Sequence, residues 1–261
     1  NNSYEENAKV NLSKAEILRY LYLDNQSNRC LKDAISNKEL INNSTIKLNI
    51  SSLIVLEQAA MLMNRQNQEE AKKIIQKNDK WILSSQNKNI EFLKAYFLLK
   101  AKIYNEINEV ENAKESLKKV NELINNNSGK NVDIYSEILY YNEIANLYFI
   151  EREYSKAIEV LLKASSNAKK IENIYLSESI QKTLVLNYLA LNSDKNYKSS
   201  ATDFLKIKEE FEKNDEEYVN SIYNLINLEK ENKFNIAKSK YYTKVYLFLG
   251  LLLIVFLSSF F

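Results

Sequence analysis

Large apolar residues recur along most of the chain at spacings of three and four, the period of an amphipathic helix. The clearest stretch covers residues 138–171, where two such helices follow one another across a short polar turn. The positions that share a face are Tyr141, Ile144, Ala145 and Tyr148 on the first helix, and Tyr154, Ala157, Leu161 and Ala164 on the second. Two apolar faces separated by so short a turn must bury against each other, so the pattern predicts an antiparallel helical hairpin.

The same arrangement is repeated along the chain, strongly at residues 94–127 and more weakly on both sides. The second strong copy contains Phe97, Ala101, Tyr104, Val110, Ala113, Leu117 and Val120. One weaker copy contains Val55, Ala59, Leu62, Ala71 and Ile75. Another contains Leu184, Tyr188, Tyr197, Ser200 and Phe204, and its turn is expected to be longer than the others by about three residues. The small residues at 71, 113, 157 and 200 are 42, 44 and 43 positions apart, so we expect each helical pair to have helices lengthened by about a turn or a longer connector. A divergent first pair is expected at residues 4–41, and a last pair with its first helix near Tyr218 and its second near Phe234.

The amino-acid composition agrees with an all-α fold and excludes several kinds of catalytic and metal-binding site. The 261 residues include 2 Gly, no Pro and no His, which excludes turn-rich β-sandwiches, glycine-rich phosphate loops and histidine-based nucleophile pairs or zinc sites. Lys and Arg number 36 against 34 acidic residues, so the net charge of +2 gives no electrostatic reason to expect nucleic acid. We therefore expect no enzyme, no cofactor and no metal.

The last 17 residues, 245–261, form an uncharged apolar run, VYLFLGLLLIVFLSSFF. At a rise of about 1.5 Å per residue it extends about 26 Å as a helix, close to the roughly 30 Å of a bilayer core. Lysines and tyrosines precede it at residues 237–244, as is typical of a membrane interface, and the run lacks the polar stripe of a buried core helix. The sequence thus predicts a helical-repeat domain at 1–236, a juxtamembrane segment at 237–244 and a transmembrane helix at 245–261.

The hairpin at residues 138–171 resembles a tetratricopeptide repeat, a pattern of about 34 residues with fixed aromatic, Leu and Ala positions. Tyr141, Ile144, Ala145, Tyr148, Tyr154, Ala157 and Ala164 match that pattern in order. The match departs at the fifteenth position, where Arg152 replaces Gly, and at the thirty-second, where Lys169 replaces Pro. These replacements predict longer helices and a less regular turn. The resemblance implies an all-α, right-handed superhelical solenoid of about five to six antiparallel helix pairs, followed here by the transmembrane helix.

The resemblance also implies a concave face, lined by the first helix of each pair, on which a protein or peptide partner binds. Its groove positions fall on Ala95, Leu98, Lys102 and Asn105 in one copy and on Leu139, Asn142, Asn146 and Phe149 in the next. Asn142 and Asn146 lie one turn apart, so we expect their amides to bind an extended backbone. Lys102 and Lys182 are expected to receive a carboxylate, in a partial likeness to the carboxylate clamp of chaperone-binding members. The alternative is that these are solvated polar residues without a ligand.

Together these features indicate a membrane-anchored, non-catalytic interaction or sensory domain. It is similar to the extracytoplasmic, periplasmic repeat regions that precede a single membrane helix in bacterial sensor kinases and transcriptional regulators. Because the chain starts at Asn1 rather than Met and stops within apolar sequence, we expect a removed signal peptide and a further domain beyond Phe261. The alternative is a tail-anchored cytosolic adaptor that recruits partner proteins to a membrane, which the lysines before the span favour.

Overall fold

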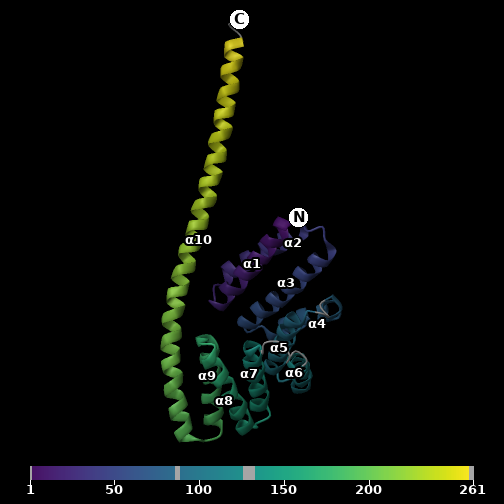
Figure 1. The fold of residues 1–261 in the computed structure, drawn as a ribbon, viewed down its shortest axis with the longest axis vertical. Coiled ribbons are helices and arrows are strands. Elements are labelled where there is room, and N and C mark those ends of the chain that lie inside the picture. Colours follow the sequence, from purple (N-terminus) through teal and green to yellow (C-terminus); the bar gives the residue numbers. More distant parts are fainter. Residues whose placement is uncertain (1, 86–88, 126–132, 259–261) are drawn as a thin grey trace. The chain divides into compact units, whose positions relative to one another are not determined.

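The computed structural model describes residues 2–85, 89–125 and 133–258, and within these ranges it contains ten helices and no strand (Figure 1). The helices form five consecutive pairs: α1 (Asn2–Tyr20) with α2 (Asp24–Glu39), α3 (Ser44–Asn64) with α4 (Gln68–Ser85), α5 (Ile90–Glu106) with α6 (Val110–Asn125), α7 (Ile134–Ile150) with α8 (Tyr154–Lys170), and α9 (Ile174–Ala190) with the start of α10 (Asp194–Ser258). The chain divides into two compact units, Asn1–Phe211 and Glu212–Phe261. All five pairs belong to the first unit.

The turn inside each pair has the same length and the same conformation. Its middle residue adopts a left-handed backbone with φ between 54° and 62°, and these residues are Tyr22, Gln66, Asn108, Arg152 and Asn192. The next residue then donates its amide to a carbonyl five positions earlier, as Glu153 does to Tyr148 at 2.8 Å. This is the Schellman ending, which satisfies the free carbonyls at a helix terminus. The expectation of a less regular turn at Arg152 is therefore wrong, and so is that of a longer turn before Tyr197.

Arg152→Gly is expected to stabilise the protein by about 1 kcal/mol, because the left-handed conformation costs a residue with a Cβ atom roughly that much. Arg152→Val is expected to destabilise it, since β-branched side chains are least tolerated at positive φ. Urea unfolding followed by circular dichroism measures both effects. Opposite signs for Gly and Val support the conformational explanation, whereas a loss of stability in both variants would instead assign a contact to the Arg152 side chain.

Small residues lie where the two helices of a pair touch. The residues at these contacts are all fully buried, and they are Ala15 and Ser27, Ala59 and Ala71, Ala101 and Ala113, and Ala145 and Ala157. In the first pair the Ser27 hydroxyl donates to the Ala15 carbonyl oxygen at 2.7 Å. The predicted register of the repeats is thus confirmed from the second to the fourth pair, and it extends to the divergent first pair.

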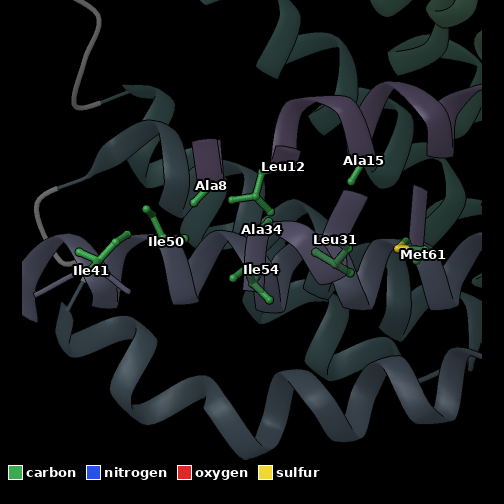
Figure 2. Packing of buried hydrophobic residues seen from close by; sticks show 9 residues of the cluster. All are labelled: Ala8, Leu12, Ala15, Leu31, Ala34, Ile41, Ile50, Ile54 and Met61. Atoms are coloured by element: carbon green, nitrogen blue, oxygen red, sulfur yellow. The ribbon is translucent and has the colours of Figure 1, made fainter. Parts of the chain in front are cut away.

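Larger apolar side chains fill the space around these contacts. Figure 2 shows one such cluster, in which Leu12 of α1, Leu31 of α2 and Ile54 of α3 come together. Each helix α3, α5, α7 and α9 also begins with a side-chain cap, and the capping residues are Asn43, Asn89, Asp133 and Asn173. A cap satisfies an amide that would otherwise have no partner in the first turn of the helix, which gives part of the abundant Asn a structural use.

The first helices of the pairs, α1, α3, α5, α7 and α9, contact one another in succession. Each second helix from α2 to α8 contacts its own partner and the first helix of the next pair, and no two second helices touch within the described part of the chain. The first helices therefore lie on the inner side of the stack, and we call the surface that they form the first-helix face. Its inner position follows from packing, because closely spaced helices on one side and separated helices on the other make a stack curve.

Within the second unit, α10 continues as one helix to Ser258. The helix break expected between Tyr218 and Phe234 is absent from this described stretch, because it contains neither Gly nor Pro and its Lys, Glu, Leu and Asn residues allow a helix to continue. The predicted span at 245–261 is helical as far as Ser258, but residues 259–261 and the side chains from Leu247 onward lie outside the described part. Gly129, which the sequence places between two predicted pairs and which we expect to cap a helix, lies outside it as well.

Only α3 is long and apolar enough to cross a membrane among the described residues, judged by length and composition. Its most apolar window is 44% buried within the structure. Ile50, Ile54 and Ala59 belong to the core, and Glu57 is paired with Arg19 of α1. Packing inside the helical stack thus accounts for the apolar character of α3.

Candidate functional site

Two successive first helices, α1 and α3, are joined by a buried ion pair. Arg19 Nε donates to Glu57 Oε1 at 2.8 Å, and each residue is only 8% exposed. Asn64 adds a hydrogen bond from its side-chain amide to the Arg19 carbonyl at 3.0 Å. Burial raises the pKa of Glu57, and the guanidinium of Arg19 opposes that rise. The pair satisfies two groups that would be costly to bury alone.

A second polar contact between successive first helices links α5 to α7. We call this contact and the Arg19–Glu57 pair the two joints. Asn105 Nδ2 donates to Glu143 at both the backbone oxygen, at 3.0 Å, and the carboxylate Oε2, at 3.1 Å. Asn146 Nδ2 donates to the same Oε2 at 3.3 Å. Lys102 is exposed on α5 and lowers the pKa of Glu143 through its charge. With Asn142, which lies one turn before Asn146, these residues form what we call the α5–α7 polar cluster.

The two joints occupy equivalent places in the repeat. Both bonds connect residues 38 positions apart, and both run from the last turn of one first helix to the middle of the next. Glu143 therefore corresponds to Glu57, and Asn105 corresponds to Arg19. Glu57 faces a guanidinium, whereas no cation lies within ion-pair distance of Glu143 in the described chain. The buried cation of α5, Lys94, is instead paired with Asp133 at 2.6 Å.

Burial raises the pKa of Glu143, although Lys102 and the amides of Asn105 and Asn146 act against the rise. For an acid whose pKa is higher in the folded state, the unfolded chain releases its proton first as the pH rises. Stability is therefore fully present below the unfolded pKa of about 4.3 and falls as the pH rises through the folded value, by about 1.4 kcal/mol for each unit of elevation. The Glu143 carboxylate thus weakens the fold at neutral pH.

Glu143→Gln is accordingly expected to be more stable than the wild type at pH 7, by about 1 kcal/mol or more. The difference is expected to shrink as the pH is lowered to 4, where Glu143 is protonated. Urea unfolding at a series of pH values measures it, with Glu122→Gln on the surface of α6 as the matched control. If the wild type instead became more stable relative to Glu143→Gln between pH 5 and pH 7, the predicted direction of the pH dependence would be contradicted.

Several polar acceptors of the first helices have no donor within the described part of the chain. The side-chain oxygens of Asn105, Asn142 and Asn187 are buried without a hydrogen-bond partner. Asn105 is 5% exposed and Asn187 is fully buried. Buried polar atoms are normally paired, so an acceptor without a donor in the chain calls for an ordered water or a group of a ligand as its partner. Two of the three lie in the α5–α7 polar cluster.

The structure brings together three of the five residues predicted for the partner site, because Lys102, Asn105 and Asn146 all interact with Glu143. Asn142 lies on α7 one turn before Asn146, and its side-chain oxygen makes no hydrogen bond to them. Lys182 lies exposed on α9, and no described contact connects it to the cluster. Glu143 itself was missed from the sequence. The available signal was a single charged residue within an otherwise uncharged stretch of a helix, a feature that Glu57 shares.

The first-helix face also brings distant repeats together. Tyr135, at the start of α7, lies close enough to Tyr20, at the end of α1, for the two phenol groups to interact. Burial and this contact raise the pKa of Tyr135 to about 12. Side chains of the first and fourth pairs thus approach each other on the first-helix face. No group of three or more potential metal ligands occurs in the described part of the chain.

The comparisons with known proteins show a likeness in fold and none in sequence. No family model matches the sequence, and no curated protein matches it. Among solved structures, the chain is similar to a crystal structure of a kinesin light chain from Podosopora anserina with nearly identical TPR-like repeats. The two share 15% sequence identity with a TM-score of 0.51, over 80% of this chain and 98% of the other. The protein therefore has a TPR-like, all-α helical-repeat fold, as the sequence predicted.

Proposed function

We propose that the solenoid is a non-catalytic interaction domain whose first-helix face binds a protein or peptide partner. The observation that carries this proposal is the α5–α7 polar cluster, where amide donors and unpartnered acceptors gather on the inner side of the stack. A peptide in an extended conformation has unpaired N–H and C=O groups, which such amides bind. Helical-repeat stacks expose this inner surface for partners, and the fold supports that use.

Replacing Asn142 and Asn146 together by Ala is expected to weaken partner capture by about 1–3 kcal/mol, because each lost amide leaves polar groups of the partner unpaired. The fold should be retained, since the Asn142 oxygen has no internal partner to lose and Glu143, which loses its 3.3 Å bond from Asn146, keeps both bonds from Asn105. The measurement is binding of a partner, first isolated on the complete chain in detergent, to the wild type and the double variant. Lys118→Glu, on the exposed side of α6, is the control. Equal affinity of wild type and double variant would remove these asparagines from the site.

We further propose that residues 245–261 anchor the chain in a membrane. The support is their uncharged length, the flanking lysines and tyrosines, and the helical backbone up to Ser258. In the leading arrangement the solenoid is extracytoplasmic and serves a signalling or regulatory protein. In the alternative it is a cytosolic adaptor with a tail anchor. Resistance to alkaline extraction tests the anchor, and protease protection of the solenoid in sealed membranes separates the two orientations.

A further inference from the structure

The chain provides an internal comparison between two equivalent joints. At the joint of α1 with α3, a guanidinium from Arg19 neutralises Glu57. At the joint of α5 with α7, the corresponding donor is the neutral amide of Asn105, and Glu143 is left without a cation in the described chain. The second joint thus repeats the first except for the positive charge.

The groups that remain around Glu143 are acceptors. The side-chain N–H of Asn105 donates a hydrogen bond to the Glu143 carboxylate. The oxygen of the same planar Asn105 amide therefore lies close by, buried and without a partner. Asn142 contributes another buried, unpartnered oxygen from the same face of α7 as Asn146. A carboxylate that has amide donors but no cation, together with two amide oxygens that have no donor, matches a ligand that carries several N–H groups and a positive charge.

Lys102 does not fulfil this requirement. Its side chain is exposed, and although its charge lowers the pKa of Glu143, it makes no ion pair with that carboxylate. Lys94, the buried lysine of the same helix, is held by Asp133 and Glu91. No described cation of the chain therefore pairs with Glu143, which leaves this position to a cation from a partner molecule.

We propose that Glu143, Asn105 and Asn142 form a subsite for the guanidinium of an arginine side chain from the bound partner. Guanidinium is favoured over ammonium because its planar set of five donors matches a carboxylate together with neighbouring amide oxygens, and because the equivalent joint uses arginine. This inference rests on the proposed function and specifies the chemistry of its ligand. It differs from the expectation that this face receives a carboxylate, since its buried charged group is an acid.

Ligand-observed saturation-transfer NMR with the complete chain in a nonionic detergent tests the subsite. The probe is N-acetyl-arginine-N-methylamide, and the matched neutral control is the citrulline analogue, which has the same shape without the charge. We expect saturable transfer to the arginine probe and at least fivefold less to the citrulline probe. Equal transfer to the two probes, or no saturable transfer to either, would overturn the proposal.

Two variants assign the signal to the site. Glu143→Gln is expected to reduce transfer to the arginine probe at least fivefold. Asn105→Arg is expected to do the same by placing a guanidinium on Glu143 from within the chain, as Arg19 does on Glu57. Circular dichroism checks that both are folded, and Glu122→Gln serves as the surface control. Unchanged transfer in either folded variant would reject the subsite. The proposed function itself would stand if a partner still contacts the first-helix face.

Discussion

Ala157→Leu is expected to destabilise the solenoid by about 2–3 kcal/mol, because overpacking of a tight core contact has a cost of this size. Ala157 is fully buried and lies opposite Ala145, which is also fully buried, where α7 and α8 approach closely. A leucine there must separate the two helices or adopt a strained rotamer. Urea unfolding followed by circular dichroism measures the loss.

The matched control is Ala95→Leu, the same substitution at an exposed position of α5. Surface replacements of this kind usually change stability by less than about 0.5 kcal/mol. An Ala157→Leu variant as stable as Ala95→Leu would show that the helix register of the repeat is incorrect.

Arg19→Ala is expected to have a larger effect, a loss of about 3–5 kcal/mol at neutral pH, because it leaves a buried carboxylate without its cation. Burial already raises the pKa of Glu57, and removal of Arg19 raises it further. The loss is therefore greatest above that pKa and decreases as the pH falls and Glu57 becomes protonated. Urea unfolding at pH 7 and at pH 4 measures both parts of this prediction.

The double variant Arg19→Met, Glu57→Leu separates the effect of the unpaired charge on stability from the effect of lost packing. Replacing a buried ion pair with apolar side chains of similar volume is often neutral or stabilising. We therefore expect this variant to recover most of the stability that Arg19→Ala loses. A double variant as unstable as Arg19→Ala would assign the loss to packing, which the alkyl part of arginine also provides.

The register of the helix pairs was predictable because it depends on small residues at regular intervals, and Ala71, Ala113 and Ala157 are visible in the sequence. The uniform length and conformation of the turns were not predicted. The repeat pattern asks for Gly at their middle position, but any residue can adopt the left-handed conformation at a cost of roughly 1 kcal/mol when hydrogen bonds at the helix end compensate. Arg152 does so with the same bonds as Asn108.

The candidate site was predicted only in part. Asn142 and Asn146 follow from the positions that the repeat pattern assigns to the first helix of each pair. Glu143 lies at a position that the repeat pattern leaves open, and its burial depends on Asn105, 38 residues earlier. A contact between two helices at that distance is a tertiary property, which helical periodicity alone does not contain.

Site-specific photo-crosslinking tests most directly the claim that the first-helix face binds the partner. A photoreactive residue replaces either Lys102, on the first helix of the third pair, or Lys118, on the second helix of the same pair, and both positions are exposed. The complete chain, in its own membrane or in detergent, is then irradiated with the isolated partner. We predict a crosslink to the partner from position 102 and none from position 118. A crosslink from position 118 alone would contradict the account and assign binding to the outer surface of the stack.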